Sequence, residues 1–452
     1  MKNIKFLAFA FATFLLVGCE DYFGADSNVD PDNPISVNET VILPQVQARL
    51  AYTYGGDFAR YLGINTHHVD GIARQHLVFH NYGIIGSDCD AAWSNIFTGT
   101  LQSNRRLIQQ AEEKGFNHFA GVGKALEAFT MMAATDFWGD LPYSDALRFD
   151  EVAVYSPTFD SQQSIYEALF ALIDEARGAL QKDDGGFPLA GDLFYGGDAS
   201  KWVKFLNVLE ARGRLHLSKI NGDAAYTAAL AALDKGGFAN RSEGFAFSYG
   251  SGATENAPMF QFIQQRGDTE TGAAYVALLQ QFNDPRLTTY GQPVVGHPIF
   301  VPNQLQQMLS YTEQEFIRAE ANLMLGNKTE AYTAYLAGIR SSFAEAALSS
   351  NQDTVQARYD EYVAQSTVGV GESNLTLKNI ITQKYLALLA EPEVFNDWRR
   401  TGYPELTPNV GSQIPRRLPY AQTRFSQMII WMPLRYQFHF HPYLVGCAIG
   451  FP

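Results

Sequence analysis

Apolar side chains recur at helical spacing along most of this chain, and no other feature limits its fold as strongly. The first stripe contains Trp93, Phe97, Leu101, Leu107 and Ala111. Residues three or four positions apart lie on the same side of an α-helix, so such a stripe predicts a helix with one buried face. Stripes of this kind lie at 93–111, 119–137, 160–180, 198–217, 316–323, 332–343 and 375–389.

Polar residues at the start of several stripes support these helices. Asp160 and Thr312 are each followed three positions later by Gln or Glu, which is the spacing of a capping box, and Asp198 is a candidate N-cap. Gly326-Asn327 predicts a short turn between two stripes, so 316–343 resembles a tetratricopeptide-type hairpin. One hairpin cannot bury its own apolar face, and stacked neighbours can. We therefore predict a mainly α fold of tetratricopeptide-like helical hairpins.

Five segments lack this helical spacing and are predicted to be loop-rich. The segment 236–311 is the longest, and Gly, Pro and aromatic residues are frequent in it. We expect it to form, with other long loops, a second lobe with few short strands that packs against the hairpins. Loops on a rigid scaffold often carry binding residues, so this lobe is the predicted ligand-binding part. The five segments are 53–90, 138–160, 183–200, 236–311 and 344–374.

The N-terminus has the features of an export signal. Lys2 and Lys5 precede the apolar run Phe6–Val17, which is too short for a helix of about 20 residues that spans a bilayer. Gly18-Cys19 then offers a small residue for cleavage and a thiol for lipid attachment, as in a bacterial lipoprotein signal. We predict a signal peptide at 1–18, palmitate-type acylation of Cys19, a polar tether at 19–37 and a body at 38–424. In the alternative, an ordinary secretory signal, Cys19 would be incidental.

Charge and cysteine content exclude two classes of protein. The formal net charge of −14 becomes −16 when Lys2 and Lys5 leave with the signal. This charge repels phosphate backbones, and the sequence contains no basic stripe, so we expect no nucleic-acid partner. If Cys19 is acylated, only Cys89 and Cys447 remain, and they are far apart in the sequence. A disulfide framework is therefore not indicated.

The sequence carries no recognisable catalytic motif. It lacks a G-x-S-x-G elbow and a P-loop. His67, His68, His76 and His80 form a small cluster, but no Glu follows His76 directly, so the zinc-hydrolase pattern fails. We interpret these histidines as solvated or satisfied in the core, and predict neither a metal site nor a cofactor. A catalytic carboxylate pair stays open because the spacing that matters is spatial.

Three further motifs have structural interpretations. Asp88 or Asp90 could supply oxygen to a cation, but capping the helix that carries Trp93 is the favoured role. Trp138 is expected to end a helix and wedge between lobes. Arg399 or Arg400 is expected to pair with an interior acid, rather than to form a binding platform.

A series of motifs in a fixed order resembles the SusD/RagB-like outer-membrane lipoproteins, in particular the second SusD-like branch. Each motif is weak alone, and the order makes the resemblance specific. The series begins at Cys19 and continues with Asn28–Pro34 (NVDPDNP), Thr135–Ser144 (TDFWGDLPYS), Asp284–Leu287 (DPRL), Ala319–Ala321 (AEA), Ile380–Tyr385 (IITQKY), Trp398–Pro404 (WRRTGYP) and Ile414–Arg417 (IPRR).

The resemblance implies a function that the residue spacing does not. Members are non-catalytic proteins that capture oligosaccharides, or sometimes peptides, at the cell surface. They cover a SusC-like TonB-dependent transporter in the outer membrane, to which a lipid anchor holds them. Their tetratricopeptide-like hairpins face the transporter, and a loop lobe holds the ligand. The alternatives are a surface glycoside hydrolase and a helical-repeat adaptor that binds no ligand.

Three residues are predicted to lie in or near the ligand site: Arg74, Tyr82 and Trp93. They precede or open the first long helix, where binding residues of the family often fall. Trp93 has an alternative role as a core residue of that helix.

The C-terminal segment 425–452 departs from the family pattern. It contains no acidic residue and one Arg, and it includes the apolar run Met428–Met432. We interpret it as an atypical tail, either frame-shifted or a hydrophobic docking segment.

Overall fold

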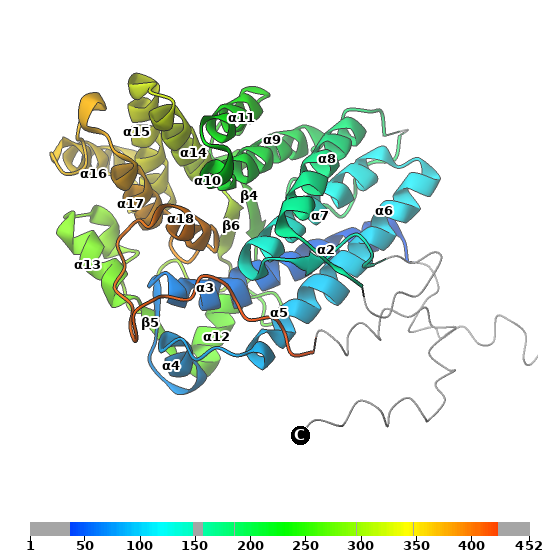
Figure 1. Cartoon of the computed structure of the whole chain (residues 1–452), viewed down its shortest axis with the longest axis horizontal. Coiled ribbons are helices and arrows are strands. Elements are labelled where there is room, and N and C mark those ends of the chain that lie inside the picture. The colour runs from blue at the N-terminus through cyan, green and yellow to red at the C-terminus, as the bar shows by residue number, and fades with distance from the viewer. Residues whose placement is uncertain (1–36, 148–156, 185, 295, 347, 424–452) are drawn as a thin grey trace, which may run out of the picture.

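A computed structural model describes residues 37–147, 157–184, 186–294, 296–346 and 348–423. The predictions for the signal peptide, Cys19, nearly all of the tether and the tail concern residues outside these ranges. Within the described ranges the fold is mainly α-helical, with only short strands, as predicted (Figure 1).

The N-terminal half contains the long helices α6, α7, α8 and α9, and two π-helical segments interrupt its other helices. The elements are α2 (Glu39–Thr53), η2 (Tyr54–Phe58), α3 (Ala59–Asn65), α4 (Arg74–His80), η3 (Gly86–Cys89), α5 (Asp90–Ser94), η4 (Asn95–Leu101), α6 (Gln102–Lys114), α7 (Asn117–Trp138), α8 (Gln162–Leu180), α9 (Ala199–His216), α10 (Ser218–Asn221) and α11 (Asp223–Asp234).

The C-terminal half contains the predicted hairpin and several shorter helices. The elements are η5 (Arg241–Glu243), α12 (Pro258–Arg266), α13 (Ala273–Gln281), η6 (Pro285–Thr288), α14 (Tyr311–Met324), α15 (Lys328–Glu345), α16 (Gln352–Ala364), η7 (Glu372–Asn374), α17 (Leu377–Ala387) and α18 (Glu393–Thr401).

In the described part of the chain, six short strands form three antiparallel pairs. β1 (Val69–Gly71) pairs with β5 (Thr269–Thr271), so that Val69 lies opposite Thr271. β2 (Leu141–Pro142) pairs with β3 (Phe159–Asp160), and β4 (Phe245–Ser248) pairs with β6 (Leu305–Leu309). These pairs join segments that are distant in the sequence, and they do not merge into one sheet.

Sequential helices pack as hairpins, as the apolar stripes predict. α7 lies against α8, α9 against α11, and α14 against α15. The turn of the α14–α15 hairpin lies at Gly326-Asn327, and a Cβ on Gly338 would come within 3.0 Å of the Phe316 ring. A side chain at this position would push the Phe316 ring aside, so glycine allows the close approach of the two helices.

Some predicted helix starts are displaced by one or two residues. Ser161 is the N-cap of α8 and accepts from the Ser164 N–H (3.1 Å), whereas Asp160 accepts from the Tyr143 and Ser144 N–H groups. Ser310, and not Thr312, caps α14. Asp198 caps α9 as predicted.

The predicted loop segments are more helical than expected. Segment 236–311 contains α12 and α13, segment 53–90 contains α3 and α4, and segment 344–374 contains α16. The prediction was wrong here because α12 and α13 have nine residues each, which is too few for a clear periodic stripe.

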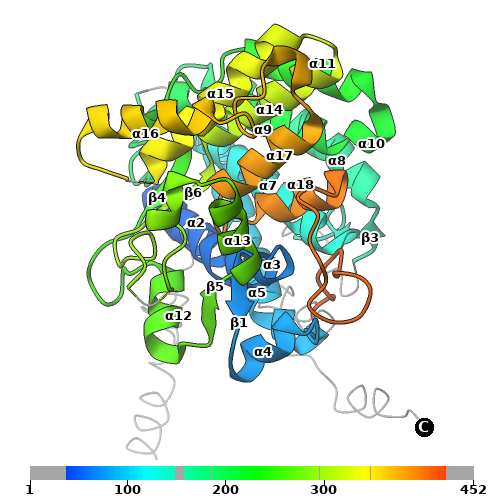
Figure 2. The same ribbon diagram turned by 90° about the vertical axis from the view of Figure 1, so that its left-hand side faces the viewer.

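Two apolar cores fill the molecule. The larger core lies among α2, α6, α7, α8 and α9, and the smaller among α13, α14, α15, α16 and α17. Figures 1 and 2 both show α11 and α15 at one edge of the molecule and α4 and α12 at the opposite edge.

Buried charges connect the helices between the two cores. Lys384 of α17 lies 2.6 Å from Asp397 of α18 and 4.0 Å from Glu313 of α14, and all three side chains are at most 4% exposed. Burial disfavours the charged lysine, but Asp397 and Glu313 outweigh this effect and raise the pKa of Lys384. Arg400 pairs with Glu320, which confirms the predicted interior partner.

Removing the charge of Lys384 should destabilise the fold strongly. We expect Lys384→Met to lower the free energy of unfolding by about 3–5 kcal/mol, because the buried network loses a positive charge and, within the described ranges, Asp397 keeps only Arg400 as a partner. The measurement is chemical denaturation followed by circular dichroism.

Lys378→Met is the matched control on the same helix. Lys378 is 55% exposed and pairs with the exposed Glu405, so its loss should cost about 1 kcal/mol or less. Equal losses in the two variants would contradict the structural role of the buried network.

Candidate functional site

The predicted site residues Arg74 and Tyr82 flank helix α4 at one edge of the molecule. β1 leads into α4, and the partner strand β5 is fixed beside it through the carbonyl of Asp268, which accepts from the Ile72 N–H (2.8 Å). α12 ends at Arg266, immediately before β5. Three short elements therefore meet at what we call the α4 surface, defined by Asp70–Ile85 and Asn409-Val410.

The backbone around α4 is unusual. His67, Arg74 and Tyr82 all have positive φ angles, at 59°, 47° and 60°. His67 and Tyr82 are the left-handed residues that end α3 and α4, because the next N–H groups donate back to the carbonyls of Gly63 (2.9 Å) and Val78 (2.8 Å). Arg74 begins α4, so no helix end explains its left-handed backbone, which is unfavourable for a residue with a Cβ.

Arg74 is held by a fully buried carboxylate. Its guanidinium pairs with Asp268 and donates to the carbonyl of Arg266, while its side chain stays 57% exposed. Asp268 also accepts from Arg266 (2.9 Å). Burial disfavours ionisation of Asp268, but the hydrogen bonds from Arg74 and Arg266 prevail and lower its pKa. The carboxylate therefore fixes one edge of the guanidinium, and the exposed remainder can reach a ligand.

Tyr82 is fixed by a distant part of the chain. Its hydroxyl accepts from the Asn409 N–H (2.9 Å) and lies 3.3 Å from His67 Nε2. The Asn409 side chain donates to the carbonyl of His80 (3.1 Å). Burial raises the pKa of Tyr82, against a smaller opposing effect of the Asn409 hydrogen bond. Contacts at the hydroxyl of Tyr82 therefore fix the position of its half-buried ring.

Apolar side chains surround these polar groups on the α4 surface. Leu77 and Val78 lie on α4 itself, and their exposed fractions are 43% and 51%. Large apolar side chains are usually buried, so a group of exposed ones indicates a surface that meets another molecule. The exposed set is Ile72, Leu77, Val78, Ile85 and Val410.

Trp93 does not belong to this surface. It is 1% exposed, and its ring packs against Phe97 and Trp138 at centroid distances of 4.4 and 5.3 Å. Because no face of the indole is available to a ligand, we correct the prediction: Trp93 has the alternative role, in the core. The indole N–H of Trp138 donates to the carbonyl of Pro419 (3.0 Å) and ties α7 to the C-terminal stretch.

Among the buried histidines of the cluster, His68 has a structural role, whereas neither ring nitrogen of His76 has a hydrogen-bond partner in the described part of the chain. His68 Nε2 lies 3.1 Å from the carbonyl of Tyr385, and Nδ1 accepts from the Ala390 N–H (3.0 Å). Burial lowers the pKa of His68 to about 3 and that of His76 to about 4, so both are neutral. Across the described ranges, no three His, Cys, Asp or Glu side chains converge on a possible metal position.

Asp88 caps a short turn and not the helix of Trp93. Its carboxylate accepts from the Ile85 N–H (2.9 Å) and from the Gln75 side chain (2.7 Å). No side chain caps α5, which begins at Asp90. The prediction that Asp88 or Asp90 caps the helix carrying Trp93 is therefore wrong.

A family model described as "Starch-binding associating with outer membrane" matches residues 31–305 and 293–421. The chain belongs to the SusD-like family. No curated protein matches it significantly. Among the described residues, no helix combines the length and the apolar composition that crossing a bilayer requires.

Solved structures with the same fold cover most of the chain. A SusD/RagB family protein of Bacteroides thetaiotaomicron has 24% identity and a TM-score of 0.68 over 86% of this chain and 94% of its own. A Bacteroides vulgatus structure, described as a "putative outer membrane protein, probably involved in nutrient binding", has 21% identity and a TM-score of 0.71, with 87% and 95% covered. A chitin-binding SusD homologue of Flavobacterium johnsoniae has 20% identity and a TM-score of 0.71, with 87% and 95% covered.

Sequence reasoning missed the residues that hold the α4 surface together. Asp268 lies in a segment predicted to be loop, and Asn409 lies 327 positions from its partner Tyr82. The sequence shows the motif Trp398–Pro404, but no pattern in the residues after it predicts that this stretch returns to α4.

Asp268 is expected to anchor α4. We predict that Asp268→Asn raises amide hydrogen exchange in residues 72–80, because the neutral amide no longer balances Arg74 and Arg266. Glu270→Gln is the control two residues away, on β5, and it should leave this exchange unchanged. Unaltered protection of α4 in Asp268→Asn would contradict the anchoring role.

Proposed function

We propose that this chain is a non-catalytic lipoprotein of the outer cell surface that captures oligosaccharides and passes them to a SusC-like TonB-dependent transporter. The observation that carries the proposal is the match of a starch-binding, outer-membrane-associated family model to residues 31–305 and 293–421. A fold-level neighbour is described as chitin-binding, which also favours a glycan. Peptide is the second ligand class.

The α4 surface is the proposed place of capture. The uncovered part of the half-buried Tyr82 ring can contact the C–H face of a sugar, and the exposed part of Arg74 can donate to its hydroxyl groups. The surrounding apolar side chains add contact area without specific hydrogen bonds. A broad surface of this kind favours modest affinity, which suits capture followed by release.

The transporter partner is proposed to meet the tetratricopeptide-like hairpins. The edge with α11 and α15 lies opposite α4 and α12, so both surfaces can be engaged at once (Figure 2). Acylated Cys19 would hold the protein at the membrane, because two or three acyl chains contribute about 0.8 kcal/mol per buried CH₂.

Binding to polysaccharides tests the capture surface. We expect the purified chain to bind insoluble starch or chitin in a sedimentation assay, and Tyr82→Ala or Arg74→Ala to weaken binding about five- to tenfold, as loss of one good contact would. Arg74 pairs with the buried Asp268, and Tyr82 accepts from the Asn409 N–H, so both variants should also lose some stability. Binding is therefore measured well below the melting temperature of each variant.

Tyr332→Ala and Arg340→Ala on α15 are the controls, since they remove a tyrosine and an arginine from the opposite edge. Equal weakening by these variants would contradict the assignment of the α4 surface. Release of soluble sugar, abolished by replacing one Asp or Glu, would favour a glycoside hydrolase. Binding to the transporter with no glycan or peptide bound would favour an adaptor.

The lipid anchor has a separate test. Cys19→Ser should abolish incorporation of labelled palmitate and move the protein from the membrane fraction to the soluble fraction, because the acceptor thiol is lost. Cys89→Ser, which removes a buried free thiol, is the control and should keep the label. Labelling that survives Cys19→Ser would contradict the lipoprotein assignment.

A further inference from the structure

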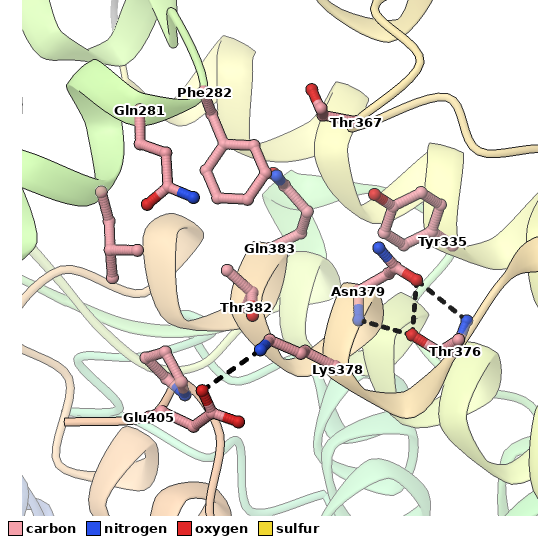
Figure 3. A pocket seen from close by; sticks show the side chains of 12 residues that line it. Gln281, Phe282, Tyr335, Thr367, Thr376, Lys378, Asn379, Thr382, Gln383 and Glu405 are labelled. Carbon is pink, nitrogen blue, oxygen red and sulfur yellow. Dashed lines mark hydrogen bonds and ion pairs between the residues drawn. The ribbon is translucent and has the colours of Figure 1, made fainter.

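A separate cleft lies between α13, α17 and the loop at Pro404-Glu405. Its volume is about 280 Å³. Small-molecule sites commonly occupy about 300–1,000 Å³, so a ligand of one or two rings is the size that fits. Figure 3 shows Gln281 and Phe282 on one side of the cleft, and Thr382 and Asn379 on the other.

The wall that carries Phe282 is rigid. Asn283 adopts a left-handed conformation (φ 45°), and the next N–H, that of Asp284, donates to the carbonyl of Leu279 (2.9 Å). Asp284 then pairs with Arg286 at 2.6 Å, and both side chains are fully buried. Because the turn is anchored in the core, the half-buried Phe282 ring is held in place before any ligand arrives.

Several polar groups of the cleft have no partner within the described part of the chain. The side chains of Gln281 and Thr382 make no hydrogen bond there. Asn379 uses its Oδ1 to accept from the Thr376 N–H (3.0 Å), and its amide nitrogen is left as a donor. Figure 3 shows this nitrogen turned away from Thr376, toward the cleft.

The charges of the cleft cancel. Lys378 and Glu405 are the charged residues among those that line it, and they pair at 3.3 Å. A charged ligand would need an unpaired partner of opposite sign, which this lining does not offer. A flat ring with free amide and hydroxyl groups beside it favours a neutral molecule that has both C–H faces and hydroxyl groups.

We propose that this cleft is a second glycan site, which binds one or two rings of a neutral sugar with a face on Phe282. Asn379 Nδ2, Gln281 and Thr382 hydrogen-bond the hydroxyl groups. None of the residues that line the cleft belongs to the α4 surface. The proposal depends on the proposed function in one respect, namely that the ligand of this protein is a glycan.

The test is isothermal titration of the full body with glucose, maltose, N-acetylglucosamine and chitobiose. We expect at least one of them to bind, and Asn379→Asp and Phe282→Leu each to weaken it about tenfold, as the loss of one hydrogen bond or ring contact would. Asn379→Asp keeps the oxygen that accepts from the Thr376 N–H, but it replaces the Nδ2 donor with an acceptor and adds a negative charge. Gln280→Ala, on the neighbouring exposed position of α13, is the control.

Each outcome bears on the cleft. Cleft variants that match the Gln280→Ala control, or an absence of binding by the whole sugar panel, would overturn the proposal. So would preferential binding of glucuronic acid or of a charged dipeptide, weakened by the same variants. Binding of starch or chitin that Tyr82→Ala weakens, alongside cleft variants without effect, would overturn the cleft alone and leave the proposed function intact.

Discussion

The arrangement of the C-terminal helices depends on a set of buried charges between the two apolar cores. Charged groups removed from water are costly unless each is paired, so a network of this size tolerates few alternative geometries. Burial disfavours the imidazolium of His216, but Glu393 and Asp136 outweigh it and raise the pKa of His216 to about 10. The network therefore keeps its positive charges at neutral pH. Its members are Asp136, Arg212, His216, Glu313, Glu320, Lys384, Glu393, Asp397 and Arg400.

The same network fixes the path of the chain after α18. Once Arg400 is paired with Glu320, the chain from Gly402 has a defined starting point, and it returns across α7 and α4. Trp138 holds this stretch at Pro419, and Tyr82 holds it at Asn409. The geometry of the α4 surface is thus set partly by charges buried in the helical hairpins. These long-range contacts explain how the α4 surface, which consists of short helices and strands, can be held in one geometry.

The sequence predicts what depends on local spacing and misses what depends on distant partners. Helices α7, α8, α9, α14, α15 and α17 follow from their apolar stripes, because long amphipathic helices carry a strong periodic signal. Short helices such as α12 do not. The environments of Arg74 and Trp93 could be seen only in the structure. Arg74 is positioned by Asp268, and Trp93 is buried beside Trp138. Such pairings join positions that no local pattern relates.

The α4 surface and the α13–α17 cleft are connected through the β1–β5 pair. β1 leads into α4, and β5 leads into α13, whose first N–H, that of Ala273, donates to Asp70 on β1 (2.8 Å). The pair thus joins the two surfaces through main-chain hydrogen bonds and the Asp70 contact. If both proposed sites bind the same glycan, a polymer with repeating units could reach both, whereas a single sugar could not. The second contact would then raise the affinity for the polymer through effective concentration, while each unit would still release readily.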